Sequence, residues 1–222
     1  MQDGVILVGD AGGTNVRFAL ARFADGRATL SDIWKRAGRD FATFEAALEA
    51  YLAEVRPDIA GASFGFAGVT GGPRVELLNR GWTVDLAAVG QRLGIGDLVA
   101  VNDFIAMARS APELSGDQVR QIAPGRVDPK GSCAIGGPGT GFGVGLLRRT
   151  EAGWVVIGGE GGHQAFTPET EIEWKLAGRL RAQHGYVSNE MVAGGVGFED
   201  TRDALFEVMG MKPAPLSQAE TI

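Results

Sequence analysis

A glycine-rich turn near the start of the chain carries residue types that hold phosphate and a metal ion. Residues 9–15 read Gly-Asp-Ala-Gly-Gly-Thr-Asn and join two apolar runs. Consecutive small residues let backbone N–H groups face an anion, and the threonine hydroxyl adds a donor. Asp10, at the end of the first run, can orient a magnesium ion through water. We interpret the segment as a phosphate site, although a bare Gly-Gly turn is also typical of an ordinary tight hairpin.

A second candidate is the pair Asn102-Asp103, which closes an apolar run and precedes a short helical stretch. An aspartate in this place can cap a helix, and taken alone that is the simpler interpretation. It can also act as a general base that accepts a hydroxyl proton while the oxygen attacks a phosphoryl group. The neighbouring asparagine would then hold the substrate.

The segment Gly-Gly-Glu-Gly-Gly-His at 158–163 leaves Glu160 and His163 as its projecting side chains. Glu190, in Val-Ser-Asn-Glu, supplies a further carboxylate. Carboxylates, an amide and an imidazole that converge suit a ligand rich in hydroxyl groups, such as a sugar. The alternatives are that His163 caps a turn and that Glu190 is a solvated helix residue. Neither His163 nor His184 lies in an H-x-x-x-H pattern, which disfavours a metal site made by histidines.

A second glycine turn, Gly-Pro-Gly-Thr-Gly at 137–141, lies between the apolar runs Cys133–Gly136 and Val144–Arg149. The arrangement of strand, Gly-Thr turn and strand thus occurs twice, and we interpret both turns as facing phosphate. The sequence has no G-x-x-x-x-G-K-[ST] motif and no G-x-G-x-x-G motif after a strand. Neither a P-loop nor a classical dinucleotide-binding fold is therefore expected.

Composition limits the classes of protein to which the chain can belong. It has 222 residues, 45% of them apolar, and a formal net charge of -6. That charge disfavours nucleic-acid and anionic-membrane partners, and the apolar run Val5–Val8 is far too short to span a bilayer. One cysteine, Cys133, excludes an internal disulfide and fits a reducing cytoplasm. The 35 glycines cluster beside apolar runs, which indicates close backbone approach rather than a linker.

Alternating strand and helix patterns predict a mixed α/β sheet in the first half of the chain. We expect Thr43 to cap a helix that Pro57 stops, and Thr83 to cap a helix that runs to Leu93. Asn102-Asp103 follows the last strand, at the edge where ligands bind in such sheets. The expected strands are 5–9, 16–22, 29–35, 59–66, 75–78 and 97–101.

A polar, proline-containing stretch between Ser110 and Gly131 predicts a domain boundary, so we expect domains at 1–112 and 113–222. In the second domain Thr167-Pro168 is expected to open a helix that runs to about Gly185. Ser217-Gln218-Ala219-Glu220 has the spacing of a capping box, which predicts a helix start and a chain that is part of a longer one. The other expected elements there are a strand at 154–157 and a helix at 198–209.

Five segments, taken together and in this order, resemble the ATP-dependent bacterial glucokinases. They are Gly-Asp-Ala-Gly-Gly-Thr-Asn-Val-Arg from Gly9, Val-Asn-Asp-Phe from Val101, Gly-Pro-Gly-Thr-Gly-Phe-Gly from Gly137, Gly-Glu-Gly-Gly-His from Gly159 and Val-Ser-Asn-Glu from Val187. The resemblance covers essentially the whole chain. It implies a two-domain α/β fold of the actin-like ATPase type with RNase-H-like cores, whose second domain is incomplete because family members are longer by roughly a third.

The resemblance also implies an activity, with glucose and MgATP bound in a cleft that closes on them. Asp103 would be the base that activates the 6-hydroxyl of the sugar, and Asp10 would position Mg²⁺ through water. The expected sugar-binding residues are Asn102, Asp103, Glu160, His163 and Glu190. The expected ATP-binding residues are Gly9, Asp10, Gly12, Gly13, Thr14, Asn15, Gly139, Thr140 and Gly141.

Several alternatives stay open at this point. The chain could be a non-catalytic or truncated glucose-binding protein of the family, or a kinase for another hexose, because one hydroxyl orientation can depend on a single contact. A single cysteine excludes the cysteine-rich zinc motif of the related repressors and kinases. The expected setting is the cytoplasm, without a membrane or nucleic-acid partner, and the chain could form a homodimer.

Overall fold

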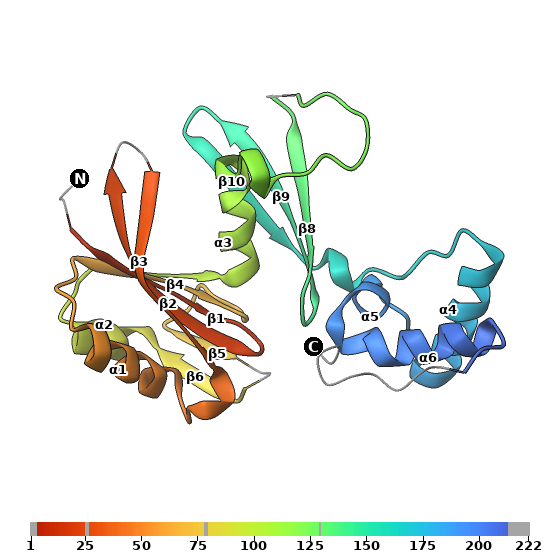
Figure 1. Ribbon diagram of the computed structural model, residues 1–222, viewed down its shortest axis with the longest axis horizontal. Helices are drawn as coiled ribbons and strands as arrows, with labels where there is room; N and C mark the ends of the chain where they lie inside the picture. The colour runs from red at the N-terminus through yellow and green to blue at the C-terminus, as the bar shows by residue number, and fades with distance from the viewer. Residues whose placement is uncertain (1–3, 25–26, 78–79, 129, 213–222) are drawn as a thin grey trace. The chain divides into compact units, whose positions relative to one another are not determined.

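The computed structural model describes residues 4–24, 27–77, 80–128 and 130–212. The chain splits into two compact units, Met1–Met107 and Ala108–Ile222 (Figure 1). In the described residues no helix is both long and apolar enough to cross a membrane. The boundary that we expected after residue 112 falls in a 3-10 turn, η2 (Ala111–Glu113).

The first unit is built on a five-stranded mixed sheet, as the alternating pattern predicted. Its strand order is β3-β2-β1-β4-β7. The three strands nearest the N-terminus form an antiparallel meander, and β4 and β7 add parallel to β1. The strands are β1 (Ile6–Ala11), β2 (Asn15–Ala24), β3 (Arg27–Ala37), β4 (Gly61–Phe66) and β7 (Leu98–Asn102).

The register of the parallel strands places the carboxyl ends of β1, β4 and β7 beside one another. Ala11 lies opposite Phe66, which lies opposite Asn102. Asp10 and Asp103, each next to one of these terminal residues, are therefore brought to the same edge of the sheet. This is the edge where parallel sheets bind ligands.

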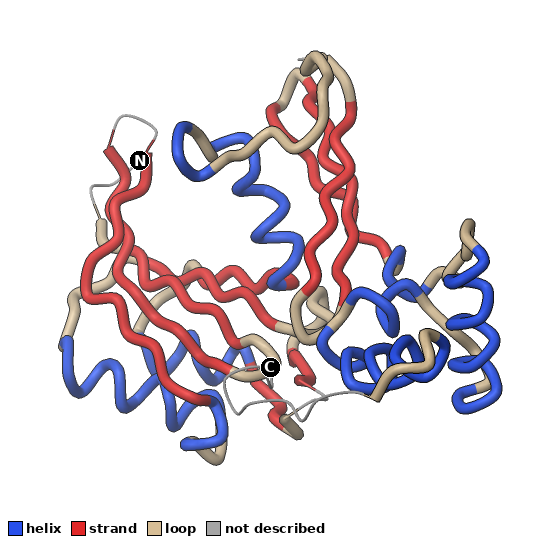
Figure 2. Tube along the Cα trace, turned by 45° about the vertical axis from the view of Figure 1, so that its right-hand side comes forward, coloured by secondary structure: helices blue, strands red, loops and turns tan. Residues whose placement is uncertain are grey.

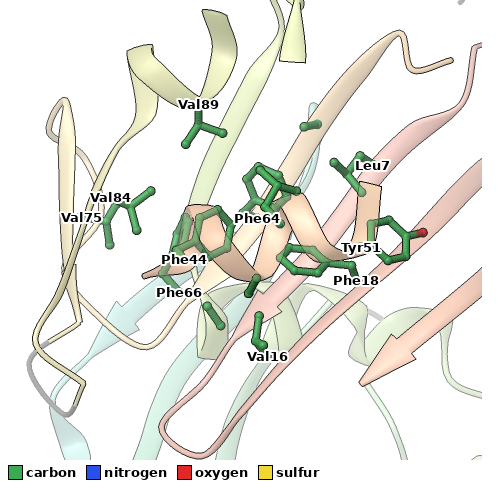
Figure 3. Close-up of a cluster of buried hydrophobic side chains, with 14 of the residues drawn as sticks. Leu7, Val16, Phe18, Phe44, Tyr51, Phe64, Phe66, Val75, Val84 and Val89 are labelled. Atoms are coloured by element: carbon green, nitrogen blue, oxygen red, sulfur yellow. The ribbon is translucent and has the colours of Figure 1, made fainter. Parts of the chain in front are cut away.

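One face of this sheet is covered by α1 (Phe44–Val55), and the residues between them form the core (Figure 3). The Thr43 hydroxyl accepts a hydrogen bond from the Ala46 amide, which confirms the predicted cap. Phe44 packs edge-on against Phe64 and Phe66, with ring centroids 5.2 and 5.1 Å away. Such contacts, with the apolar area that they bury, give this face a fixed side-chain arrangement.

The predicted cap at Thr83 is wrong. Thr83 lies in β6 (Trp82–Asp85), which pairs with β5 (Arg74–Leu77) and places Thr83 opposite Glu76. The next helix, α2 (Leu86–Leu93), is capped by Asp85, whose carboxylate accepts hydrogen bonds from two amides at 3.1 Å. These bonds help to hold the pKa of Asp85 below its usual value. Strand pairing therefore moves the helix cap by two residues, from Thr83 to Asp85.

The second unit contains a three-stranded antiparallel sheet and a group of helices (Figure 2). The sheet order is β10-β9-β8, and the turn between β8 and β9 is the second glycine turn. The last turns of α3 (Asp103–Ser110) lead into this unit through η2 and η3 (Gly116–Gln118). The sheet and helices are β8 (Ser132–Pro138), β9 (Phe142–Thr150), β10 (Gly153–Gly159), η4 (Gly161–His163), α4 (Glu171–His184), α5 (Asn189–Ala193), η5 (Gly195–Gly197) and α6 (Phe198–Val208).

The predicted start of the long helix at Thr167-Pro168 is also wrong. The amide of Phe166 donates to the carbonyl of Val187 at 2.9 Å, and that bond holds the segment in an extended form. The helix α4 begins instead after Thr170, which forms a capping box with Glu173. The capping box predicted at 217–220 lies outside the described residues.

Candidate functional site

An open pocket of about 360 Å³ lies at the carboxyl edge of the first sheet. Asp10 and Asp103 both line it, and Ser63 and Gly65 of β4 contribute its floor. The last two residues alternate along the strand with the core residues Phe64 and Phe66, so they face the opposite side of the sheet. The pocket is lined by Val8, Gly9, Asp10, Ser63, Gly65, Val101, Asp103, Ala106 and Met107.

Asp103 is half-buried in this pocket, and its environment favours the protonated acid. Burial raises the pKa of Asp103, and the negative charge of Asp10 raises it further. Hydrogen bonds from the backbone amides of Phe104, at 2.8 Å, and of Asp103 itself oppose the rise. A carboxylate whose pKa is raised in a ligand-sized pocket has the property required of a general base.

Asp103 lies directly against Gly65 of β4. A Cβ atom on Gly65 would lie 3.4 Å from the Cα atom and 3.7 Å from the Cβ atom of Asp103. This is ordinary contact distance, so the space above Gly65 is where Asp103 sits. Gly65 and Asp103 therefore lie side by side in the lining of this pocket.

Asn102 is engaged in the structure of the helix start. Its side-chain oxygen accepts hydrogen bonds from the amides of Phe104 and Ile105, at 3.0 and 3.1 Å. Its side-chain nitrogen donates to the carbonyl of Gly68 at 3.2 Å. The cap that the sequence suggested for Asp103 is therefore supplied mainly by Asn102, which leaves the Asp103 carboxylate facing the pocket.

Asp10 forms an ion pair with Arg17, its cross-strand partner on β2. Both side chains are partly exposed, so the pair adds little stability by itself. No group of three or more His, Cys, Asp or Glu side chains in the described part of the chain could hold a metal ion. Mg²⁺ commonly keeps several waters and uses one or two carboxylates with phosphate oxygens. Asp10 supplies one carboxylate in the pocket lining, which is the donor type that this mode of Mg²⁺ binding uses.

The first glycine turn is closed by its own backbone and by a neighbouring segment. The amide of Gly12 donates to the carbonyl of Asn15 at 3.1 Å, and the amide of Gly38 donates to the carbonyl of Thr14 at 3.0 Å. The space above Gly9 is filled by the rings of Phe18 and Phe64, so Gly9 has a packing role beside its place in the pocket wall. Two carbonyls of the turn are thus engaged within the first unit.

In the second unit, the structure brings Glu160, His163 and Glu190 together. His163 Nε2 lies 3.5 Å from a carboxylate oxygen of Glu160, and its Nδ1 lies 3.9 Å from one of Glu190. The Glu190 carboxylate also accepts a hydrogen bond from the Phe142 amide at 2.8 Å. Its side chain is 23% exposed. The interpretation of Glu190 as a solvated helix residue is therefore wrong.

The second glycine turn packs against the Glu190 side chain and against η5, the short turn that follows α5. The amides of Gly195 and Val196 donate to the carbonyls of Gly139 and Thr140, both at 2.9 Å. A Cβ atom on Gly141 would overlap the Glu190 carboxylate. The turn and the carboxylate that we expect to bind sugar are thus one packed group.

Gly162 allows a close backbone approach beside this group. A Cβ atom there would overlap the carbonyl oxygen of Phe142, a backbone atom that cannot rotate away. We expect Gly162→Ala to lower the free energy of unfolding by about 2 kcal/mol, within the range for overpacking. Urea denaturation followed by circular dichroism measures the change. Gly178→Ala is the matched control, because nothing lies within 4 Å of that added methyl in α4 and alanine favours a helix. Equal stabilities of the two variants would contradict this packing.

Some residues of these sites carried no signal in the sequence. Ser63 and Gly65 read as part of an apolar strand, although both line the pocket of Asp103. Phe142 holds Glu190 through its backbone amide, which every residue type except proline possesses. Only the pairing of strands and the packing of helices show that these residues belong to the sites.

Three comparisons with known proteins identify the family. A family model described as Glucokinase matches residues 7–222. The glucokinase of Ralstonia nicotianae is 39% identical over 220 residues, which cover 94% of this chain and 63% of that protein. The crystal structure of a glucokinase from an Antarctic psychrotroph superposes with a TM-score of 0.81 at 33% identity, covering 99% of this chain and 69% of that one.

A more distant structure, the glucokinase of Balamuthia mandrillaris in complex with glucose, shares the fold with a TM-score of 0.67 at 18% identity, covering 93% of this chain and 63% of that one. The fold is therefore the mixed α/β, actin-like ATPase fold that the motifs implied. The chain spans less than two thirds of the length of the curated relative above. The match over residues 7–222, the sequence identity and the shared fold show that the chain belongs to the glucokinase family.

Proposed function

We propose that this protein transfers the γ-phosphoryl group of MgATP to the 6-hydroxyl of glucose, giving glucose 6-phosphate and ADP. The observation that carries the proposal is the half-buried Asp103, whose pKa is raised, in a pocket that Asp10 also lines. Membership of the glucokinase family supports the same reaction. A protein that only binds sugar has no need of a desolvated carboxylate beside a second acidic group, which favours a kinase over the binding-protein alternative.

In the proposed reaction Asp103 accepts the proton of the 6-hydroxyl as that oxygen attacks the γ-phosphorus. A bond forms between the sugar oxygen and phosphorus, the bond to the β-phosphate oxygen breaks, and ADP leaves with the bonding electrons. Most of the rate enhancement in phosphoryl transfer comes from positioning and from charge stabilisation. Mg²⁺, when bound, neutralises the charge that develops on the phosphate oxygens.

We assign the sugar hydroxyls to the second polar group. Glu160 and Glu190 each place a carboxylate oxygen within 4 Å of the imidazole of His163. Such a set can accept and donate hydrogen bonds to neighbouring hydroxyls of a hexose. Asn102 is assigned as a further ligand, although its side chain also caps α3. Gly13, Thr14, Asn15, Thr140 and Gly141 are assigned to the phosphates, through their backbone amides and the two threonine hydroxyls.

The experiment that tests the function is a coupled assay for glucose 6-phosphate with MgATP, run beside isothermal titration with glucose. Turnover that requires both substrates supports the proposal. Glucose binding without turnover would favour the sugar-binding alternative, and turnover with another hexose in place of glucose would reassign the substrate.

Static light scattering of the same sample decides whether the protein is a homodimer. The exposed Cys133 thiol is compatible with the cytoplasmic location that we propose.

A further inference from the structure

Arg80 contacts the first glycine turn although it lies far from that turn in the sequence. Its Nε atom donates a hydrogen bond of 2.8 Å to the carbonyl of Gly12, which is 68 residues away. The guanidinium carbon lies 4.9 Å from the ring centroid of Trp82. The side chain is thereby held by stacking on one residue and by a directed hydrogen bond to another.

The same guanidinium group occupies the space above Gly38. A Cβ atom at Gly38 would overlap three atoms of the Arg80 guanidinium group. The amide of Gly38 donates to the carbonyl of Thr14. Arg80 therefore contacts the turn directly at Gly12 and also packs on the residue that binds it at Thr14.

These contacts matter for phosphate because of what they do with the carbonyl groups. A carbonyl oxygen that turned toward a phosphate would repel it, whereas outward-facing amides attract it. Hydrogen bonds to the carbonyls of Gly12 and Thr14 keep those two oxygens from turning toward a phosphate. With the carbonyls engaged, the peptide units between them are held in one orientation.

Arg80 also places a positive charge next to the turn. Burial lowers the pKa of Arg80, which shows that the cation is partly removed from water. Its Nη2 atom is buried and has no hydrogen-bond partner among the described residues. A cation in this condition gains from a nearby anion more than an exposed one does, because less water screens the interaction.

We propose that Arg80 is a positioning residue for phosphate binding: it holds the turn of residues 12–15 in its anion-binding shape through Gly12 and Gly38. The inference rests on the proposed function, in which this turn holds the ATP phosphates. According to this inference, Arg80 affects the binding of the nucleotide but not the binding of the sugar. A residue that only stabilised the fold would affect both substrates alike.

The test compares Arg80→Ala with Arg36→Ala in the full chain. Arg36 is the matched control, since its guanidinium carbon lies 4.8 Å from the ring centroid of Trp34, two residues away on the same strand, β3. Its Nη1 atom donates to the carbonyl of Lys35, which is not part of the turn. We expect Arg80→Ala to raise the KM for ATP about tenfold, the effect of one lost hydrogen bond from a charged donor. The Kd for glucose, measured by titration, should change less than twofold.

Arg80→Lys supplies a second comparison. Lysine keeps the positive charge but lacks the planar group that stacks and donates in a fixed direction. We expect its KM for ATP to lie between the values of the parent and of Arg80→Ala. Equal KM values for ATP in Arg80→Ala and Arg36→Ala would overturn the inference while leaving the kinase activity intact. A parallel loss of glucose affinity in Arg80→Ala would overturn it too, because the role would then be general stability.

Failure of the proposed function has a different signature. If the parent chain shows no turnover, hydrogen exchange of the Gly38 amide still tests the hold on the turn, because that amide bonds to Thr14. Faster exchange in Arg80→Ala than in Arg36→Ala would then support the proposal that Arg80 holds the turn of residues 12–15. Titration with inorganic tripolyphosphate would show whether this turn binds phosphate. Unchanged exchange, or tripolyphosphate binding that is equal in both variants, would overturn the inference.

Discussion

Asp103→Asn is expected to lower kcat for glucose phosphorylation about a thousandfold, which lies within the range for the loss of a general base. Asparagine has nearly the same shape as aspartate but cannot accept the proton of the 6-hydroxyl. The Kd for glucose should stay within a few-fold of the parent value, because the sugar hydroxyls are assigned mainly to Glu160, His163 and Glu190. The coupled assay and isothermal titration measure these two quantities.

Asp97→Asn is the matched control for this substitution. Asp97 precedes β7, whereas Asp103 follows that strand. The backbone carbonyl of Asp97 accepts a hydrogen bond from the Ala62 amide, and this bond does not depend on the Asp97 side chain. We expect it to keep the parent kcat. A kcat for Asp103→Asn within tenfold of the control would show that another group takes the proton. An equal loss of kcat and of glucose affinity would instead assign Asp103 to binding.

The raised pKa of Asp103 also predicts the pH dependence. The base must be ionised, so kcat/KM should fall on the acid side with a midpoint above the ordinary aspartate pKa.

The same raised pKa affects stability. Because the folded state binds the Asp103 proton more tightly than the unfolded state, the contribution of Asp103 to stability is complete below the unfolded pKa and is lost as pH rises through the folded pKa. At neutral pH, Asp103→Asn removes a desolvated charge, so its melting temperature should equal or exceed that of the parent. A lower melting temperature would contradict the burial of an ionised carboxylate.

Glu190→Ala is expected to weaken glucose binding about a hundredfold, a loss typical of a hydrogen bond to a charged group. Two effects combine in this substitution. The carboxylate that we assign to a sugar hydroxyl disappears, and the Phe142 amide loses its acceptor at 2.8 Å. The second effect loosens the start of β9, which follows the glycine turn. Isothermal titration with glucose measures the change in Kd.

Glu190→Gln separates these two effects. The glutamine oxygen can still accept the bond from the Phe142 amide, but the negative charge is gone. We expect a loss of glucose affinity of about tenfold with little change in stability. Glu207→Gln is the control, because Glu207 is an exposed glutamate of the same unit whose partner is Arg179, at 2.7 Å. A Glu190→Ala variant that binds glucose as tightly as this control would remove Glu190 from the sugar site.

Local rules were sufficient for much of the secondary structure. The helix that begins after Thr43 was predicted from one side-chain cap and one proline, because both act within a few residues. The two errors in helix starts have a common cause. Thr83 and Thr167 are both plausible caps in isolation, but pairing with β5 keeps Thr83 in a strand, and the bond from Phe166 to Val187 keeps Thr167 in an extended segment. Pairing with another segment overrode the local preference at both positions.

The sequence by itself determined which chemistry the chain can offer. Glycine turns with threonine, an aspartate after a strand, and carboxylates beside a histidine are properties of residue type and spacing. These residue types and spacings led to the hypothesis that the chain binds phosphate and a sugar. The mixed sheet could be predicted as well, because strand ends and turns follow from local patterns.

Only the tertiary structure decided how these groups are tuned. The pKa of Asp103 rises because folding buries its carboxyl group and places the negative charge of Asp10 near it. Glu190 is held by an amide 48 residues away, and the first turn by a guanidinium group 68 residues away. Burial, charge proximity and hydrogen bonds depend on distances in space. A single sequence does not contain those distances until the strands have paired and the helices have packed.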